Sequence, residues 1–219
     1  MTAKPRVVLI GGGGHGKVVL DALLESGRDV AGFIDDDPEK AGGQVLQFPI
    51  LGPSSALRDL ALRFHFEEVI VAIGDNYIRD RKFREVIAAG LKPVGVVHPG
   101  ACVSRFAELG QGVVIMAGAV VNPGTVIDDN VCVNTCACVD HDNHLSRSCH
   151  VFPNATLAGG VQVGEFSYVG SGAVVNPYCP IGSHSYVGAG AVVIRAVPDG
   201  VVVAGVPARE IAKQLKRAL

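Results

Sequence analysis

The sequence predicts a two-part protein, with an α/β domain over residues 1–98 and a parallel β-helix over residues 99–219. Two observations lead to this prediction. Residues 101–196 divide without insertion into blocks of six, and the third residue of every block is a branched aliphatic. Before them, short apolar runs alternate with segments of helical spacing. A six-residue period is typical of a parallel β-helix, and alternating strands and helices are typical of a parallel α/β sheet.

The α/β domain is expected to contain about four strands, which is half of a doubly wound nucleotide-binding fold. The predicted strands cover 6–10, 29–35, 67–74 and 92–98. Helices are expected where apolar residues recur at helical spacing. The first follows the glycine-rich segment and ends at Gly27, the second begins at Ser54 or Ser55, and the third spans 77–90.

The repeats of the second domain predict a stack of short strands and corners. The aliphatic residues at the third position of each block are Val103, Leu109, Ile115, Val121, Ile127, Val133, Val139, Leu145, Val151, Leu157, Val163, Val169, Val175, Ile181, Val187 and Val193. The first position is usually small, and Gly, Asn or Asp gather in the second half of the blocks. If three blocks make one coil, residues eighteen apart lie above one another. After Val197 we expect a Pro-containing loop and a short C-terminal helix.

The composition narrows the class of protein. Of 219 residues 48% are hydrophobic, only 5% are aromatic and none is Trp, which suits a core of medium-sized side chains. A formal net charge of −2 argues against a nucleic-acid-binding protein, which needs a basic face. No stretch has the length and apolarity of a membrane span, so we expect a cytoplasmic protein. The six cysteines form no CxxC pair and are expected to be small buried core residues.

The segment GGGGHGK (11–17) predicts a phosphate-binding turn between the first strand and the first helix. It matches G-x-G-x-x-G, and Asp35 follows about 20 residues later at the end of the second strand. It also matches G-x-x-x-x-G-K, but Val18 stands where a magnesium-binding hydroxyl would be required. Glycine N–H groups and a helix N-terminus favour phosphate. A nucleotide or nucleotide-sugar site is therefore favoured, with His15 as a ligand contact and Asp35 and Asp36 near a ribose or base; a ligand-free turn and an NAD(P) site are the alternatives.

A second candidate site lies in the repeats. The eighteen-residue register places His141 beneath Gly159, and Gly159-Gly160 offers backbone N–H groups with no side chain in the way. An imidazole beside a bare N–H combines a base near neutral pH with an oxyanion donor, which is what acyl transfer needs. A neighbouring carboxylate can raise the basicity of the ring. The spacing leaves open whether Asp140 or Asp142 does so.

Several motifs together resemble one family. They are GGGGHGK (11–17), FIDDDP (33–38), VAIGDN (71–76), VDHD (139–142), the unbroken six-residue blocks and VAGVPAR (203–209). This combination resembles the bacterial sugar acyltransferases of the sialic-acid O-acetyltransferase type, and most closely the members that N-acetylate GDP-perosamine. The resemblance implies a left-handed β-helix, acetyl-CoA as co-substrate, no metal, and a homotrimer with active sites between neighbouring chains. The products of such enzymes usually enter bacterial surface polysaccharide or glycan synthesis.

The resemblance also implies roles for individual residues. His141 would be the general base and Asp142 the carboxylate that increases its basicity, while Asn134 would lie near the acceptor. The residues implied to contact acetyl-CoA are His150, Gly159, Ser171, Gly188 and Ala189. The residues implied to hold the nucleotide end of the acceptor are Gly13, Gly14, His15, Asp35 and Asp36.

The favoured activity is direct acetyl transfer to the 4-amino group of a nucleotide-linked 4-amino-4,6-dideoxy sugar, with the Gly159 N–H stabilising the oxyanion. An O-acetyltransferase acting on a sugar hydroxyl is the nearest alternative. A non-catalytic trimer that binds a nucleotide sugar and an NAD-dependent oxidoreductase are further alternatives. The last would lack the second half of a dinucleotide fold. The nucleotide base, the sugar configuration and the length of the acyl group stay open at this point.

Overall fold

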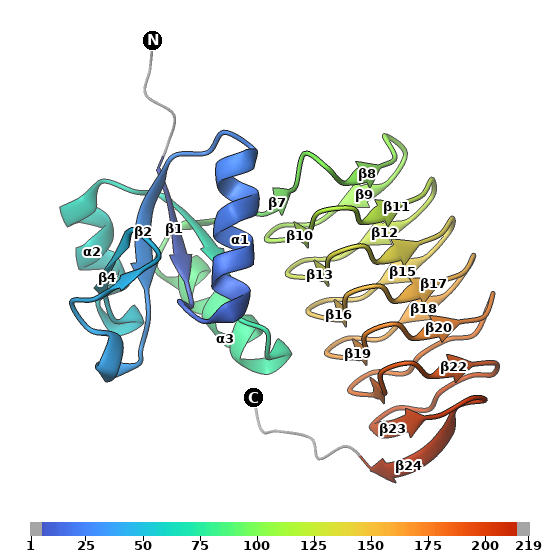
Figure 1. Ribbon diagram of the computed structural model, residues 1–219. Coiled ribbons are helices and arrows are strands. Elements are labelled where there is room, and N and C mark those ends of the chain that lie inside the picture. Colours follow the sequence, from blue (N-terminus) through green and yellow to red (C-terminus); the bar gives the residue numbers. More distant parts are fainter. Residues whose placement is uncertain (1–5, 214–219) are drawn as a thin grey trace. The chain divides into compact units, whose positions relative to one another are not determined.

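The computed structural model describes residues 6–213 of the chain (Figure 1). The chain divides into two compact units, Met1–Pro99 and Gly100–Leu219. The first is an α/β unit and the second is a parallel β-helix.

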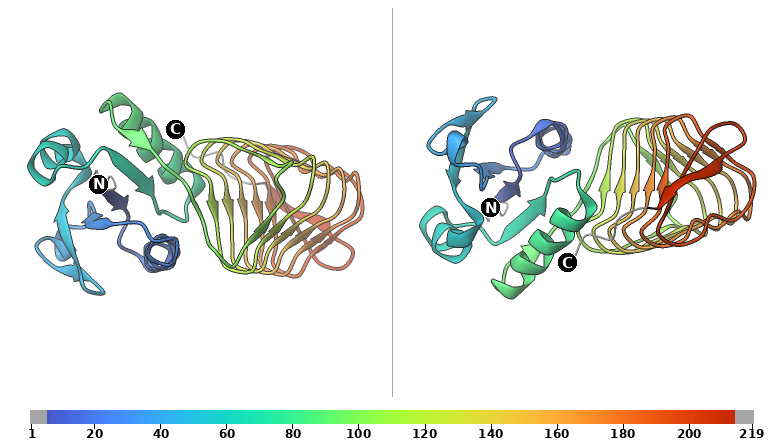
Figure 2. Two further views of the ribbon diagram at one scale, coloured as in Figure 1. Left: turned by 90° about the horizontal axis from the view of Figure 1, so that it is seen from above. Right: turned by 90° about the horizontal axis from the view of Figure 1, so that it is seen from below.

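The α/β unit is built on a six-stranded sheet with the order β3-β4-β2-β1-β5-β6. Its strands are β1 (Val7–Ile10), β2 (Val30–Ile34), β3 (Gln44–Val45), β4 (Phe48–Gly52), β5 (Glu68–Val71) and β6 (Lys92–Pro93), and β7 (Val96–Val97) follows. Its helices are α1 (Gly14–Glu25), α2 (Leu57–Phe64) and α3 (Asn76–Ala88), with 3₁₀ turns η1 (Pro38–Lys40) and η2 (Ser54–Ala56). Helix α1 covers one face of the sheet, and α2 and α3 cover the other (Figure 2).

The central strands β1, β2 and β5 are buried along their whole length, because helices cover both faces of the sheet. Val8 and Ile10 of β1 pack in one cluster with Leu60 of α2 and Phe83 of α3. Strand β1 pairs in parallel with both β2 and β5. The chain thus reverses its direction of winding beside β1, and α/β sheets bind ligands at the carboxyl ends of strands at such a point.

Residues 44–52 add two strands that the sequence analysis did not identify. Strand β4 pairs in parallel with β2, whereas β3 pairs antiparallel with β4, so the sheet is mixed. The two strands form a tight hairpin in which Leu46 has a positive φ. Pro49 and Gly52 lie within β4, and both residue types weaken a strand pattern. The predicted strand 92–98 is divided between β6 and β7.

The β-helix consists of two-residue strands, one in most of the six-residue blocks, and two longer strands follow the last block. They are β8 (Cys102–Val103), β9 (Glu108–Leu109), β10 (Val114–Ile115), β11 (Val120–Val121), β12 (Val126–Ile127), β13 (Cys132–Val133), β14 (Cys138–Val139), β15 (His144–Leu145), β16 (His150–Val151), β17 (Thr156–Leu157), β18 (Gln162–Val163), β19 (Tyr168–Val169), β20 (Val174–Val175), β21 (Tyr186–Val187), β22 (Val192–Val193), β23 (Val201–Ala204) and β24 (Arg209–Lys213). Residues eighteen apart pair in parallel, as Val121 does with Val139 and Val139 with Leu157. Three blocks therefore form each coil, as predicted, and the coils stack (Figures 1 and 2).

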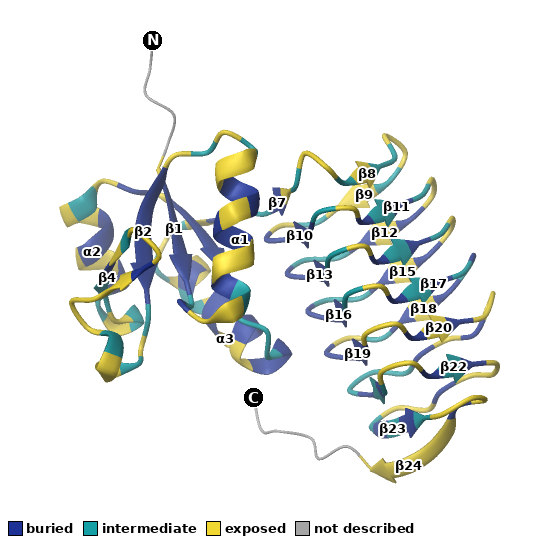
Figure 3. Cartoon of the chain, viewed as in Figure 1, coloured by how far each residue is buried: buried dark blue, intermediate teal, exposed yellow. Residues whose placement is uncertain are grey.

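The corners of the coils explain why Gly, Asn and Asp gather in the second half of the blocks. From Gly112 to Gly190, the sixth residue of every block has a φ between +55° and +75°. Glycine adopts this left-handed conformation without strain, and Asn and Asp tolerate it better than most residues. From Ile115 onward the third-position aliphatics, with most first-position small residues, fill the interior, whereas Leu109 in the first coil is exposed (Figure 3). Leu145, Val151 and Leu157, for example, are fully buried.

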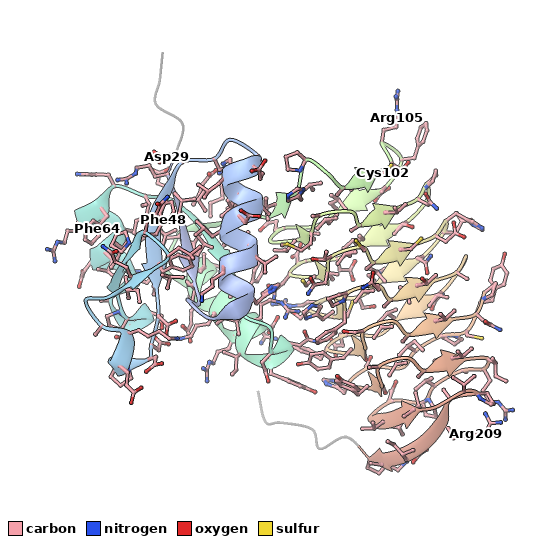
Figure 4. All side chains as sticks on the ribbon, viewed as in Figure 1. Asp29, Phe48, Phe64, Cys102, Arg105 and Arg209 are labelled. Carbon is pink, nitrogen blue, oxygen red and sulfur yellow. The ribbon has the colours of Figure 1, made fainter. Side chains whose placement is uncertain are left out.

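The C-terminal segment corrects one prediction. Residues 209–213 do not form a helix; they form strand β24, which pairs antiparallel with β23. This pairing gives hydrogen-bond partners to the backbone at the end of the stack, which an unpaired sheet edge would lack. Arg209 marks this end of the β-helix, and Cys102 and Arg105 mark the other (Figure 4). Residues 214–219 of the expected helix lie outside the described residues.

The cysteines only partly follow the prediction. Cys132, Cys149 and Cys179 are buried, whereas Cys138 is partly buried and Cys102 and Cys136 are exposed. Cys102 is the second residue of its block, where side chains point outward, and it lies on β8 at the end of its sheet. Cys136 is a corner residue with a φ of +55°. The expectation of burial is therefore wrong for Cys102 and Cys136.

Candidate active site

The corner that follows β14 holds His141 between two carboxylates with different tasks. Asp140 Oδ1 accepts hydrogen bonds from the backbone N–H of His141 and from Asn122 Nδ2, both at 2.8 Å. These bonds fix the backbone that carries the imidazole. Asp142 Oδ2 lies 2.8 Å from His141 Nδ1. Asp142, and not Asp140, is therefore the carboxylate that contacts the ring.

The Asp142 carboxylate orients the imidazole and changes its acidity. Its hydrogen bond raises the pKa of His141 above the ordinary value, and the charges of Asp140 and Asp142 add to this effect against slight desolvation. With Nδ1–H donated to Asp142, the lone pair of Nε2 is left to accept a proton. The side chain of His141 is 52% exposed, so this nitrogen is accessible to a substrate.

Gly159 lies directly beside the His141 ring, as the register predicted. A Cβ atom added to Gly159 would lie 2.5 Å from Cε1 and 2.6 Å from Nε2 of His141. A larger residue at position 159 would collide with the imidazole in this position. Within residues 6–213, no group accepts a hydrogen bond from the Gly159 N–H. A proton acceptor and an available backbone donor therefore lie side by side, which suits a reaction that forms an oxyanion.

Asn143 supports this corner and was missed by the sequence analysis. Its buried side chain donates to the carbonyls of Asp140 and Ala158, at 2.6 and 3.1 Å, and accepts from the N–H of Val161. It thus joins the coil of His141 to the coil of Gly159. The sequence could have indicated this role, because Asn143 occupies the first position of its block, where most blocks have a small or aliphatic residue.

Asn134 and His150 form a second polar cluster on another face of the β-helix. Asn134 Nδ2 lies 3.2 Å from His150 Nε2, and the His150 ring stacks on Phe152 with 4.2 Å between centroids. His150 is 2% exposed. The structure brings Asn134 and His150 together, but it places them on the sheet of β13 and β16 and not at the corner of His141.

The other residues expected to contact acetyl-CoA follow β19 and β21, further along the sheet that contains β13 and β16. Ser171 and Ala189 occupy equivalent corners of successive coils, and both are exposed. Gly188 donates its N–H to the carbonyl of Val203 at 2.7 Å. Within a single chain these residues are therefore not gathered around His141.

The glycine-rich segment leaves the N-terminus of α1 open. No side chain caps this helix, whereas the carboxylate of Asp75 caps α3 through the N–H groups of Tyr77 and Ile78. Added Cβ atoms at Gly13 and Gly14 would meet nothing within 4 Å. An uncapped helix N-terminus with free space in front of it is suited to bind an anionic group.

This helix end borders a cavity of about 390 Å³ at the carboxyl ends of β1 and β2. The five residues predicted to hold the nucleotide, Gly13, Gly14, His15, Asp35 and Asp36, all line it. Burial lowers the pKa of His15 to about 4, and the charge of Arg79 contributes. His15 is therefore neutral at physiological pH. Arg81 and Lys82 also line the cavity and were missed, although they lie in the basic run RDRKFR of the third helix.

Both cavity carboxylates also have partners within the α/β unit. Asp35 Oδ2 accepts from the N–H of Gly12 at 2.7 Å and from Lys40 Nζ at 3.0 Å. Asp36 Oδ2 lies 2.7 Å from Lys82 Nζ. Burial raises the pKa of each carboxyl group, but these hydrogen bonds outweigh it and hold both pKa values below the usual range. Asp35 therefore anchors the glycine-rich turn to the end of β2.

Across 6–213, no three His, Cys, Asp or Glu side chains gather in a way that could bind a metal ion. No helix in this range is long and apolar enough to cross a membrane.

A β-helix of six-residue repeats, with a histidine–carboxylate pair beside an available glycine amide, defines the class of the left-handed β-helix acyltransferases. Comparison with known proteins agrees. Residues 6–86 match the model of the PglD N-terminal domain. The chain is 31% identical to the GDP-perosamine N-acetyltransferase of Escherichia coli O157:H7, over 94% of this chain and 96% of that protein.

Two solved structures are similar over nearly their whole length. PerB from Caulobacter crescentus, in complex with CoA and GDP-perosamine, is 43% identical with a TM-score of 0.90, covering 96% of this chain and 99% of that one. The acetyltransferase domain of PglB from Neisseria gonorrhoeae, in complex with acetyl coenzyme A, is 39% identical with a TM-score of 0.88, covering 95% and 100%. The chain belongs to the bacterial sugar acyltransferase family of the sialic-acid O-acetyltransferase type, and it is an N-acetyltransferase.

Proposed function

We propose that this enzyme transfers the acetyl group of acetyl-CoA to the 4-amino group of a nucleotide-linked 4-amino-4,6-dideoxy sugar, with GDP-perosamine as the acceptor. The observation that carries this proposal is the position of His141 between the Asp142 carboxylate and the Gly159 amide. The Caulobacter and Neisseria structures support the two substrates, since their ligands are CoA with GDP-perosamine and acetyl-CoA. The Caulobacter enzyme was also solved with one histidine replaced by Ala, in complex with the same two ligands.

The proposed reaction is a direct transfer without a covalent acyl-enzyme. His141 Nε2 takes a proton from the acceptor amine as the nitrogen attacks the thioester carbonyl carbon. The Gly159 N–H donates to the oxyanion of the tetrahedral intermediate, and the Asp142 carboxylate stabilises the imidazolium. The C–S bond then breaks, and the CoA sulfur leaves with the proton from His141. In this scheme no step uses a metal ion.

The binding residues form the second part of the proposal. The N–H groups of Gly13 and Gly14 would hold the diphosphate, with neutral His15 beside it and with Asp35 and Asp36 near the nucleoside. Asn134 would lie near the acceptor sugar. His150, Gly159, Ser171, Gly188 and Ala189 would contact acetyl-CoA. Because these last residues are separated within one chain, we propose a homotrimer in which neighbouring β-helices bring them together.

The proposal is tested by CoA release from acetyl-CoA with GDP-, UDP- and dTDP-linked 4-amino and 4-hydroxy 6-deoxy sugars. Turnover with GDP-perosamine that is lost in His141→Asn supports it. Turnover restricted to hydroxyl acceptors would replace it with an O-acetyltransferase. Binding of nucleotide sugars without any CoA release would favour a non-catalytic protein. Sedimentation equilibrium tests the trimer independently of catalysis.

A further inference from the structure

Tyr178 is the most unusual corner residue of the β-helix. It has a φ of +58°, which is unfavourable for a large side chain with a Cβ, and it is 75% exposed. Phe166 and His184 are also ring-bearing corner residues, but they stack on each other with 5.2 Å between centroids. Among the described residues no ring stacks on Tyr178. An exposed aromatic side chain in this backbone conformation, with no other ring stacked on it, suggests a function.

The register places Tyr178 beside the proposed oxyanion site. Its N–H donates to the carbonyl of Gly159 at 3.0 Å. Its ring lies against Gly160, because a Cβ atom added there would be 2.4 Å from Cε1 and 2.5 Å from Cδ1 of the ring. His141 contacts Gly159 in the same way from the preceding coil. The two rings therefore cover the Gly159-Gly160 pair from opposite sides.

We propose that the ring of Tyr178 limits the size of the acyl group and makes the enzyme selective for acetyl-CoA. This inference rests on the proposed function. In the proposed reaction the thioester carbonyl oxygen accepts from the Gly159 N–H, and His141 then lies on one side of the thioester. Groups that point away from His141 along the stack then approach the next coil, where the ring of Tyr178 lies against Gly160. A methyl group leaves space beside this ring, whereas a longer chain collides with it.

The test compares acetyl-, propionyl- and butyryl-CoA by steady-state CoA release, with GDP-perosamine as acceptor. In the unaltered enzyme kcat/KM falls from acetyl to butyryl. Tyr178→Gly suits the positive φ and removes the ring, and it raises the butyryl-to-acetyl ratio about fifteenfold, since each accommodated methylene contributes about fourfold. Tyr178→Phe keeps the ring and retains the original ratio, which separates the ring from the hydroxyl group.

The outcomes distinguish this inference from the proposed function. An active Tyr178→Gly enzyme with an unchanged butyryl-to-acetyl ratio overturns it. A higher KM for all three thioesters at an unchanged ratio overturns it as well, because the ring would then contact the CoA arm and not the acyl group. Absence of CoA release from acetyl-CoA in the unaltered protein overturns the proposed function itself. A melting temperature for each variant confirms that the β-helix is intact.

Discussion

The β-helix and the α/β unit each bring a histidine close to glycines, but they give the two histidines opposite acid–base properties. His141 has a carboxylate at 2.8 Å, which raises its pKa, and half of its side chain is exposed. Burial, with a contribution from the charge of Arg79, lowers the pKa of His15 to about 4. The first ring is suited to exchange protons near neutral pH, and the second is suited to stay neutral beside a ligand.

The carboxylates differ in the same way. Asp142 is 72% exposed and directs one oxygen to His141, so its charge acts on the imidazole. Asp35 accepts hydrogen bonds from Gly12, Asp37 and Lys40, so its charge is used to hold the turn. The Asp142 carboxylate thus acts on an imidazole, whereas the Asp35 carboxylate acts on a backbone turn. Substitutions in the two units test this distinction.

The largest effect is expected from His141→Asn. Loss of the general base should lower kcat by at least about a hundredfold. Binding of GDP-perosamine, measured by calorimetry, should be unchanged, because the proposed nucleotide site lies in the α/β unit. His144→Asn is the matched control, since His144 is an exposed histidine that contacts Asp128. Equal losses in both variants would mean that His141 has no special role.

The next effect concerns pH. A general base must be neutral, so activity rises with pH through the pKa of His141, and Asp142 keeps that pKa raised. Asp142→Asn should therefore move the acid limb of kcat/KM to lower pH and lower its plateau about tenfold or more. Asparagine tolerates the left-handed corner, so folding is preserved. Asp140→Asn is the control, because it removes an equal charge from a carboxylate that does not contact the ring. It should shift the acid limb less than Asp142→Asn does; an equal shift would disprove the specific role of Asp142.

Asn143→Ala should affect stability more than turnover. The substitution leaves the carbonyl of Ala158 and the N–H of Val161 without their partner, while the Asp140 carbonyl keeps the Thr125 hydroxyl; this should cost about 1–3 kcal/mol of unfolding free energy. Urea unfolding measures this loss. Asn176→Ala, at an exposed position of the same face, should change it by less than about 0.5 kcal/mol. Comparable values for the two variants would show that Asn143 does not join the coils.

The β-helix was predictable because its geometry is periodic. Once three blocks form a coil, the spacing of eighteen residues alone places His141 beside Gly159, and the structure agrees. The choice between Asp140 and Asp142 was not predictable from this spacing, because it depends on the left-handed φ of Asp142 and on side-chain rotamers. Strand β24 was missed because its partner β23 lies beyond the last repeat.

The α/β unit was less predictable because its contacts are not periodic. The glycine motif located the turn and the helix that follows it, and the cavity gathers all five residues expected there. Lys82, however, comes from α3 and contacts Asp36 across forty-six positions of sequence. No local pattern reports such a contact. The sequence pattern also did not predict the short strands β3 and β4, because tertiary pairing, and not local propensity, stabilises them.

The smallest effect is expected at His15, and it sharpens the comparison of the two histidines. With a pKa of about 4, His15 stays neutral from pH 5.5 to pH 7.5, so it should add no proton linkage to ligand binding in this range. The Kd for GDP-perosamine, whose diphosphate is a diester, should differ by less than about twofold between these two pH values. Calorimetry in two buffers of different ionisation enthalpy measures the proton uptake that accompanies binding. This uptake should be the same for the unaltered protein and for His15→Asn. Tighter binding at pH 5.5 that disappears in His15→Asn would mean that the diphosphate raises the pKa of His15 enough to protonate it, and the two histidines would then both exchange protons during turnover.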